Sequence, residues 1–132
     1  MEERSHSEVG GIYLAGASPM KLLLQRELAT TTPPVRLRIV STRRELLENL
    51  QTKAYRVAFV GTDATGADPA SLVSAAVECA PGTAVVAAIE HADEGVIVEC
   101  MRAGAQDVVT ADRVDRIAAA VRAVLDGGAR RD

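Results

Sequence analysis

The feature that most constrains the fold is an alternation of short apolar runs with longer amphipathic stretches. Five runs and five stretches follow one another along the chain. This alternation is typical of a parallel sheet with helices on both faces. We expect the strands at residues 11–15, 35–40, 55–60, 84–89 and 107–109.

The character of each run indicates its place in the sheet. Runs 55–60 and 84–89 are nearly continuous in apolar residues, as strands buried on both faces are, so we place them at the centre. Run 35–40 alternates arginine with apolar residues, which predicts a half-exposed edge strand.

The 132 residues fit one α/β domain, expected over residues 11–126 between tails at 1–10 and 127–132.

The amphipathic stretches carry separate signals for the start of a helix. Ser18-Pro19 and Asp68-Pro69 each place a capping side chain before a proline suited to the first helical position. Thr42 followed by Glu45 has the spacing of a capping box. Asp93 and Asp112 are expected to cap the last two helices.

The composition argues against several classes of function. Aromatic residues make up 2% of the chain, so stacking platforms for single-stranded nucleic acid are missing, and a net charge of -3 is unlike a phosphate-backbone binder. No apolar run approaches the length of a membrane span, and the N-terminus does not resemble a signal peptide. The two cysteines lie far apart, which favours small hydrophobic side chains in a reducing cytoplasm.

Two groups of polar residues follow the predicted central strands. Asp63 and Asp68 come after the third run, where we favour a turn residue for Asp63 and a helix cap for Asp68. Glu90, His91, Asp93 and Glu94 follow the fourth run. With a single imidazole, this second group is better interpreted as a solvated loop and a helix cap than as a metal site.

The segment 101–109, with its sequence Ala103-Gly104-Ala105, resembles the turn that leads from the fourth helix into the fifth strand of a known family. Together with the five strand-helix units and Tyr55 at the third strand, the chain resembles the receiver domain of bacterial response regulators from Gly11 to Leu125. The resemblance implies a flavodoxin-like, doubly wound sheet of five parallel strands in the order 2-1-3-4-5, with five helices.

The resemblance also implies where a phosphoryl-accepting site belongs. Active receivers hold magnesium with an acidic pair after the first strand, because this hard cation takes oxygen ligands. They accept the phosphoryl group on an aspartate after the third strand, and a hydroxyl and a lysine follow the fourth and fifth strands. In this chain the five positions, which we call the acceptor pocket, are occupied by Ala15, Gly16, Gly61, Ile89 and Ala111. The alternative to a turn residue at Asp63 is a displaced phosphoacceptor.

An acceptor pocket without carboxylate, hydroxyl or lysine predicts a degenerate receiver, or pseudo-receiver, that is not an enzyme and takes no metal or cofactor. Its expected role is phosphorylation-independent signalling or localisation, through a protein partner, an attached effector domain or a second copy. We call the expected contact surface the partner face; it consists of Glu94, Val108, Arg113, Arg116, Ala120 and Ala123. The alternative is a small-molecule sensor that binds its ligand in the acceptor pocket.

Overall fold

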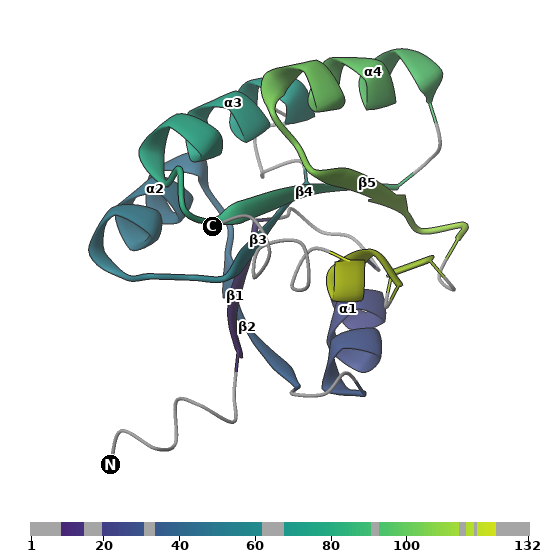
Figure 1. The fold of residues 1–132 in the computed structure, drawn as a ribbon, viewed down its shortest axis with the longest axis horizontal. Helices are drawn as coiled ribbons and strands as arrows, with labels where there is room; N and C mark the ends of the chain where they lie inside the picture. The colour runs from purple at the N-terminus through teal and green to yellow at the C-terminus, as the bar shows by residue number, and fades with distance from the viewer. Residues whose placement is uncertain are drawn as a thin grey trace.

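The computed structural model describes residues 9–14, 20–30, 34–61, 68–90, 93–113, 116–117 and 119–123. Strands and helices alternate as expected (Figure 1). The elements are β1 (Val9–Leu14), α1 (Met20–Ala29), β2 (Val35–Val40), α2 (Arg43–Thr52), β3 (Val57–Val60), α3 (Pro69–Cys79), β4 (Ala84–Ile89), α4 (Glu94–Ala103) and β5 (Asp107–Thr110). Residues 116–117 and 119–123 are helical again; we call them the C-terminal helical segment.

All five strands are parallel and lie in the order β2-β1-β3-β4-β5, which confirms the predicted topology. β3 is central and every one of its residues is buried. β2 lies at the edge, with Arg36 and Arg38 exposed, as its alternating sequence predicted. β1 begins at Val9, so residues 9 and 10 belong to the sheet and not to the expected tail.

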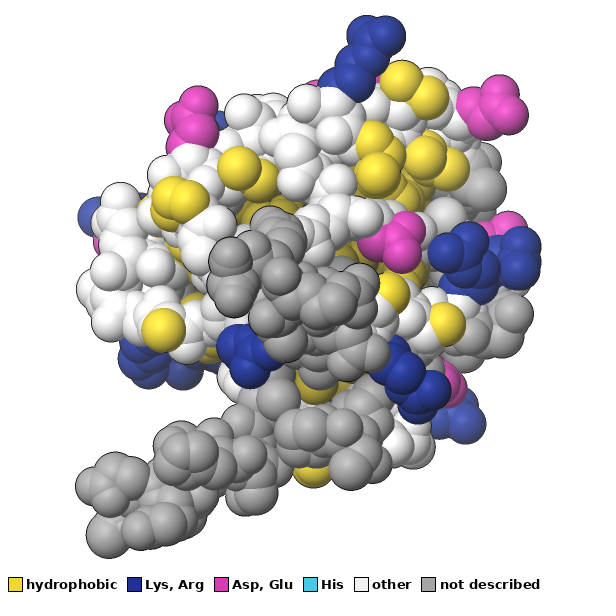
Figure 2. Space-filling view, in the orientation of Figure 1, with side chains coloured by type: hydrophobic (Ala, Val, Ile, Leu, Met, Phe, Trp, Pro, Cys, Tyr) yellow, Lys and Arg dark blue, Asp and Glu magenta, His cyan; other side chains and the backbone are white. Residues whose placement is uncertain are grey.

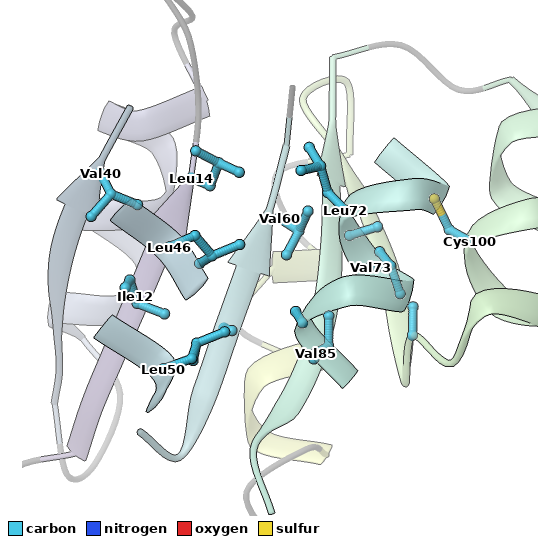
Figure 3. Close-up of a cluster of buried hydrophobic side chains, with 14 residues drawn as sticks. Ile12, Leu14, Val40, Leu46, Leu50, Val60, Leu72, Val73, Val85 and Cys100 are labelled. Carbon is cyan, nitrogen blue, oxygen red and sulfur yellow. The ribbon is translucent and has the colours of Figure 1, made fainter. Parts of the chain in front are cut away.

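Successive side chains along the strands point to opposite faces of the sheet, and they form two hydrophobic cores, one on each face. α1 and the C-terminal helical segment cover one face, where Leu24 and Ile117 pack against Tyr13 and Phe59. α2, α3 and α4 cover the other face (Figure 1). Figure 3 shows this second core, where Leu46 and Leu50 of α2 lie beside the sheet and Cys100 comes from α4.

The helix-start signals are confirmed at α2 and α4. The Thr42 side chain accepts a hydrogen bond of 3.1 Å from the Glu45 amide, and Glu45 Oε1 accepts one of 2.9 Å from the Ser41 amide. The Asp93 side chain accepts from the Val96 amide at 3.2 Å. Asp68 occupies the N-cap position of α3 but forms no such bond. The Ser18 signal lies outside the described residues.

The Ala-Gly-Ala turn ends α4 for a clear physical reason. Gly104 adopts a left-handed φ of 117°, which glycine tolerates at a helix C-terminus. Its N–H donates to the carbonyls of Cys100 and Met101, and the Ala105 N–H donates to the Cys100 carbonyl at 3.1 Å. A Cβ at Gly104 would lie 3.1 Å from Val77 Cγ2 of α3, so the turn also lets the two helices approach.

Within the described part of the chain, no helix is both long and apolar enough to cross a bilayer. The predicted C-terminal tail and most of the predicted N-terminal tail lie outside the described residues.

Candidate functional site

The parallel strands bring their carboxyl ends to one edge of the sheet, which is where ligands bind in open α/β folds. Three positions of the acceptor pocket lie there: Gly61 directly after β3, Ile89 at the end of β4 and Ala111 directly after β5. The Ala111 N–H donates to the Ile89 carbonyl at 3.2 Å, and the Gly61 N–H donates to the Leu14 carbonyl at 2.8 Å. Ala15 and Gly16, which follow Leu14, lie outside the described residues.

Gly61 lies where a side chain would be tightly packed against the backbone. An ideal Cβ at this residue would lie 3.0 Å from the Ala88 carbonyl oxygen and 3.1 Å from the Leu14 carbonyl oxygen. Both oxygens belong to the backbone of flanking strands, so they cannot turn away as a flexible side chain would. A side chain at the position that the resemblance assigns to a phosphoacceptor aspartate would therefore need β1 and β4 to move apart by a few tenths of an ångström.

The neighbouring positions present hydrocarbon only. Ile89 is buried, and Ala111 is half-buried against the core under α1. Thr110, which pairs with Ile89 in the sheet register, is the one buried polar side chain among the described residues. Thr110 was not among the predicted site residues, although it directly precedes Ala111 in the sequence. A single hydroxyl does not replace a carboxylate pair as a magnesium ligand set.

No group of three or more potential metal ligands is found among the described residues. Asp93 is engaged as the cap of α4, and Glu94 is exposed in the first turn of that helix. Asp63 and His91, two further candidates after the central strands, lie outside the described residues.

The two cysteines occupy different environments. Cys100 is fully buried, and this burial raises the pKa of its thiol, with the charges of Asp68 and Glu99 acting in the same direction. The Cys100 thiol therefore stays protonated at neutral pH and has little nucleophilic character. Cys79 is half-buried. Its thiol donates a hydrogen bond to the Leu47 carbonyl oxygen, at an Sγ–O distance of 3.5 Å.

The partner face divides into an exposed and a buried part. Glu94, Arg113, Arg116 and Ala123 are exposed, and Arg116 lies 3.9 Å from Asp107 in a partly exposed ion pair. Val108 is half-buried against the core under α2, α3 and α4.

Ala120 was expected on the partner face, but it is only 2% exposed. It packs in the core beside Ile117 and Val121 because the C-terminal helical segment turns this side toward the sheet. Ala120 is therefore not available to a partner, and only the exposed residues of the partner face can contact one.

Two exposed apolar side chains on α4 were not anticipated. Val98 is 48% exposed and Met101 is 46% exposed. Hydrophobic side chains gather over α4 at the upper right of Figure 2. The signal was present in the sequence, because Val96, Ile97 and Val98 are consecutive and cannot all point inward from one helix.

No protein-family model and no curated protein sequence matches the chain. Solved structures do. A CheY-like response regulator receiver domain from Methanospirillum hungatei aligns with a TM-score of 0.79 at 14% identity, over 94% of this chain and 98% of that one. The signal receiver domain of a Luxo repressor protein from Vibrio parahaemolyticus gives 0.77 at 14% identity, over 92% and 93%.

A longer structure, NtrX from Brucella abortus, aligns with a TM-score of 0.78 at 18% identity. It matches 92% of this chain but only 28% of its own. At such low identities the similarity establishes the fold: this chain has the fold of a response regulator receiver domain.

Proposed function

We propose that the chain is a pseudo-receiver, a signalling or localisation module of a bacterial, cytoplasmic response-regulator-type system that works without phosphorylation. The observation that carries this proposal is the set of side chains at the carboxyl edge of the sheet. Gly61, Ile89 and Ala111 stand where an active receiver needs a carboxylate, a hydroxyl and an ammonium group.

Each substitution removes a different part of the chemistry. A glycine has no side-chain oxygen to accept a phosphoryl group, and a Cβ at Gly61 would already lie 3.0 and 3.1 Å from two backbone carbonyl oxygens. Ile89 and Ala111 have neither a donor nor a positive charge to stabilise phosphoryl oxygens. In the sequence, Ala15 and Gly16 offer no side-chain ligand for magnesium.

With this chemistry missing, the proposed activity is protein binding by the partner face. Exposed arginines favour it, because a guanidinium forms forked hydrogen bonds with carboxylates. The partner is a separate protein or an effector domain attached to this one. The NtrX chain, which is much longer than the part that this chain matches, is consistent with the second arrangement.

Phosphoryl transfer is tested by incubating the protein with acetyl phosphate and magnesium and measuring its intact mass, with an active receiver domain treated in parallel. We expect the active receiver to gain a phosphoryl group and this chain to keep its mass. A phosphorylated aspartate identified in this chain would contradict the proposal.

A further inference from the structure

β2 forms one edge of the sheet along its whole length. All six of its residues pair with β1, and among the described residues no strand lies beyond it (Figure 1). The strand contains no proline and its register runs without a bulge, two features that would otherwise blunt an edge. Such an edge presents backbone N–H and C=O groups that can pair with another extended segment.

The directions of the β2 backbone groups follow from those of β1. The Leu14 carbonyl points to β3, where it accepts a hydrogen bond of 2.8 Å from the residue after that strand. Directions alternate along a strand, so Tyr13 faces β2, where its register partner is Ile39. In a parallel pair, a residue that faces its neighbour bonds to the residues on either side of its register partner. Arg38 therefore faces β1, while the N–H and C=O groups of Leu37 and Ile39 point away from the sheet.

The two faces of β2 differ in chemistry. Leu37 and Ile39 are partly buried against the core under α1. Val40 packs into the core on the opposite face, so Arg36 and Arg38, which alternate in step with Val40, lie on that face. Both arginines are exposed, since α2 packs mainly against β1 and α3. A strand added beside β2 would therefore meet apolar side chains on one face and arginines on the other.

We propose that the outer edge of β2 binds an extended segment of a partner protein in which acidic residues alternate with apolar ones. The backbone of this segment pairs with the outward groups of Leu37 and Ile39. Its acidic side chains lie beside Arg36 and Arg38, because opposite charges on neighbouring strands stabilise a sheet and a guanidinium binds a carboxylate through two hydrogen bonds. Backbone pairing supplies affinity in this mode of recognition, and alternate side chains supply specificity.

A second copy of the chain is a poor occupant of the same edge. Two β2 strands paired antiparallel about a two-fold axis would bring Arg36 and Arg38 of both copies onto one face of the ribbon. Like charges on facing strands destabilise a sheet, and positive charge is a common device against edge-to-edge pairing. The charge of β2 therefore favours an acidic segment. The inference goes beyond the proposed function, because β2 shares no residue with the partner face or the acceptor pocket.

The inference is tested with a synthetic peptide of six residues that alternates glutamate and valine, titrated into the isotope-labelled protein. We expect saturable shifts of the Leu37 and Ile39 amide resonances at up to millimolar peptide. Arg38→Glu should weaken binding by about tenfold, because it replaces an attractive charge pair with a repulsive one. The matched control is Arg102→Glu, at an exposed arginine of α4, which should leave the affinity within about twofold.

Charge reversal of the whole edge gives a second result. Arg36→Glu/Arg38→Glu should bind a peptide that alternates lysine and valine more tightly than the glutamate peptide. A peptide with three glutamates followed by three valines should bind the wild type at least about tenfold more weakly than the alternating one, because it cannot match both faces of β2. Equal binding of the two arrangements, or tighter binding of a single-stranded oligonucleotide, would show attraction to any polyanion and overturn the inference.

Methylation of the peptide backbone tests the strand pairing itself. Successive N–H groups of a strand point to opposite sides, so methylating the nitrogens of the glutamates or of the valines blocks one side only. One of these two peptides should lose at least about tenfold in affinity and the other should bind as the unmodified peptide does. Equal affinities of the two methylated peptides would contradict strand addition. A chain that keeps its mass with acetyl phosphate but fails this test would refute the inference and leave the proposed function standing.

Discussion

Gly61 is the residue on which the proposed loss of phosphoryl chemistry depends most, because glycine has no carboxylate. The sequence alone predicts this residue type at the end of the third strand. The two carbonyl oxygens that crowd the position were not predictable from the sequence, because they belong to Leu14 and Ala88 on strands distant in the sequence. A contact of this kind depends on how tightly three strands pack after they have paired.

This contact predicts the effect of adding a side chain. Gly61→Ala should lower the free energy of unfolding by about 1–3 kcal/mol, as overpacking does. Gly61→Asp should lower it at least as much, because its side chain is larger than that of alanine, and it should not restore phosphorylation. Gly82→Ala is the control, since a Cβ there meets nothing within 4 Å, and it should change stability by less than about 0.5 kcal/mol. Denaturant unfolding measures all three, and equal losses at Gly61 and Gly82 would contradict the packing argument.

At the scale of elements, the sequence located helix starts better than it predicted their hydrogen bonds. The N-caps of α2 and α4 have φ values of -130° and -139°, and both side chains bond to the helix. Asp68 offers the same kind of side chain but has a φ of -62°, and it directly precedes the proline that begins α3. The capping pattern identifies the position, while the backbone around it decides whether the bond forms.

The observed start of β3 also differs from the predicted one, since the strand begins at Val57 and not at Tyr55. The Tyr55 carbonyl accepts a hydrogen bond from the Thr83 hydroxyl at 2.9 Å, outside the sheet register. The hydrophobic pattern continues through Tyr55 because its half-buried ring packs against the core. The predicted strand therefore included two residues before Val57 that are not part of the hydrogen-bonded strand.

Reversing charges on the partner face should change partner binding more than it changes stability. Changing Arg113 and Arg116 together to glutamate should weaken partner binding, while the thermal midpoint falls by no more than about 5 °C, since exposed ion pairs contribute little to stability. The matched control is Lys21→Glu/Arg26→Glu, two exposed charges on α1. Pull-down with each variant, alongside thermal unfolding, compares the two surfaces. If the Arg113/Arg116 variant retains the wild-type partners and the α1 variant loses them, the contact surface lies on α1.

For the whole molecule, the strand order followed from the resemblance, and the alternation of apolar runs placed every strand within two residues of its observed start. Such patterns succeed because strands buried on both faces need continuous apolar sequence. The exposed apolar side of α4 was missed for the opposite reason. An amphipathic pattern shows which residues are apolar, but packing against α3 and the sheet decides which of them remain in water.

We propose that the receiver fold is present here without its phosphoryl chemistry. The most direct test is an amide NMR titration with magnesium, followed by magnesium with beryllofluoride, which mimics a phosphoryl group. We predict that the resonances of Gly61, Ile89 and Ala111 stay in place at millimolar magnesium and after beryllofluoride is added. Saturable shifts centred on these three residues would show a working acceptor pocket and contradict the claim.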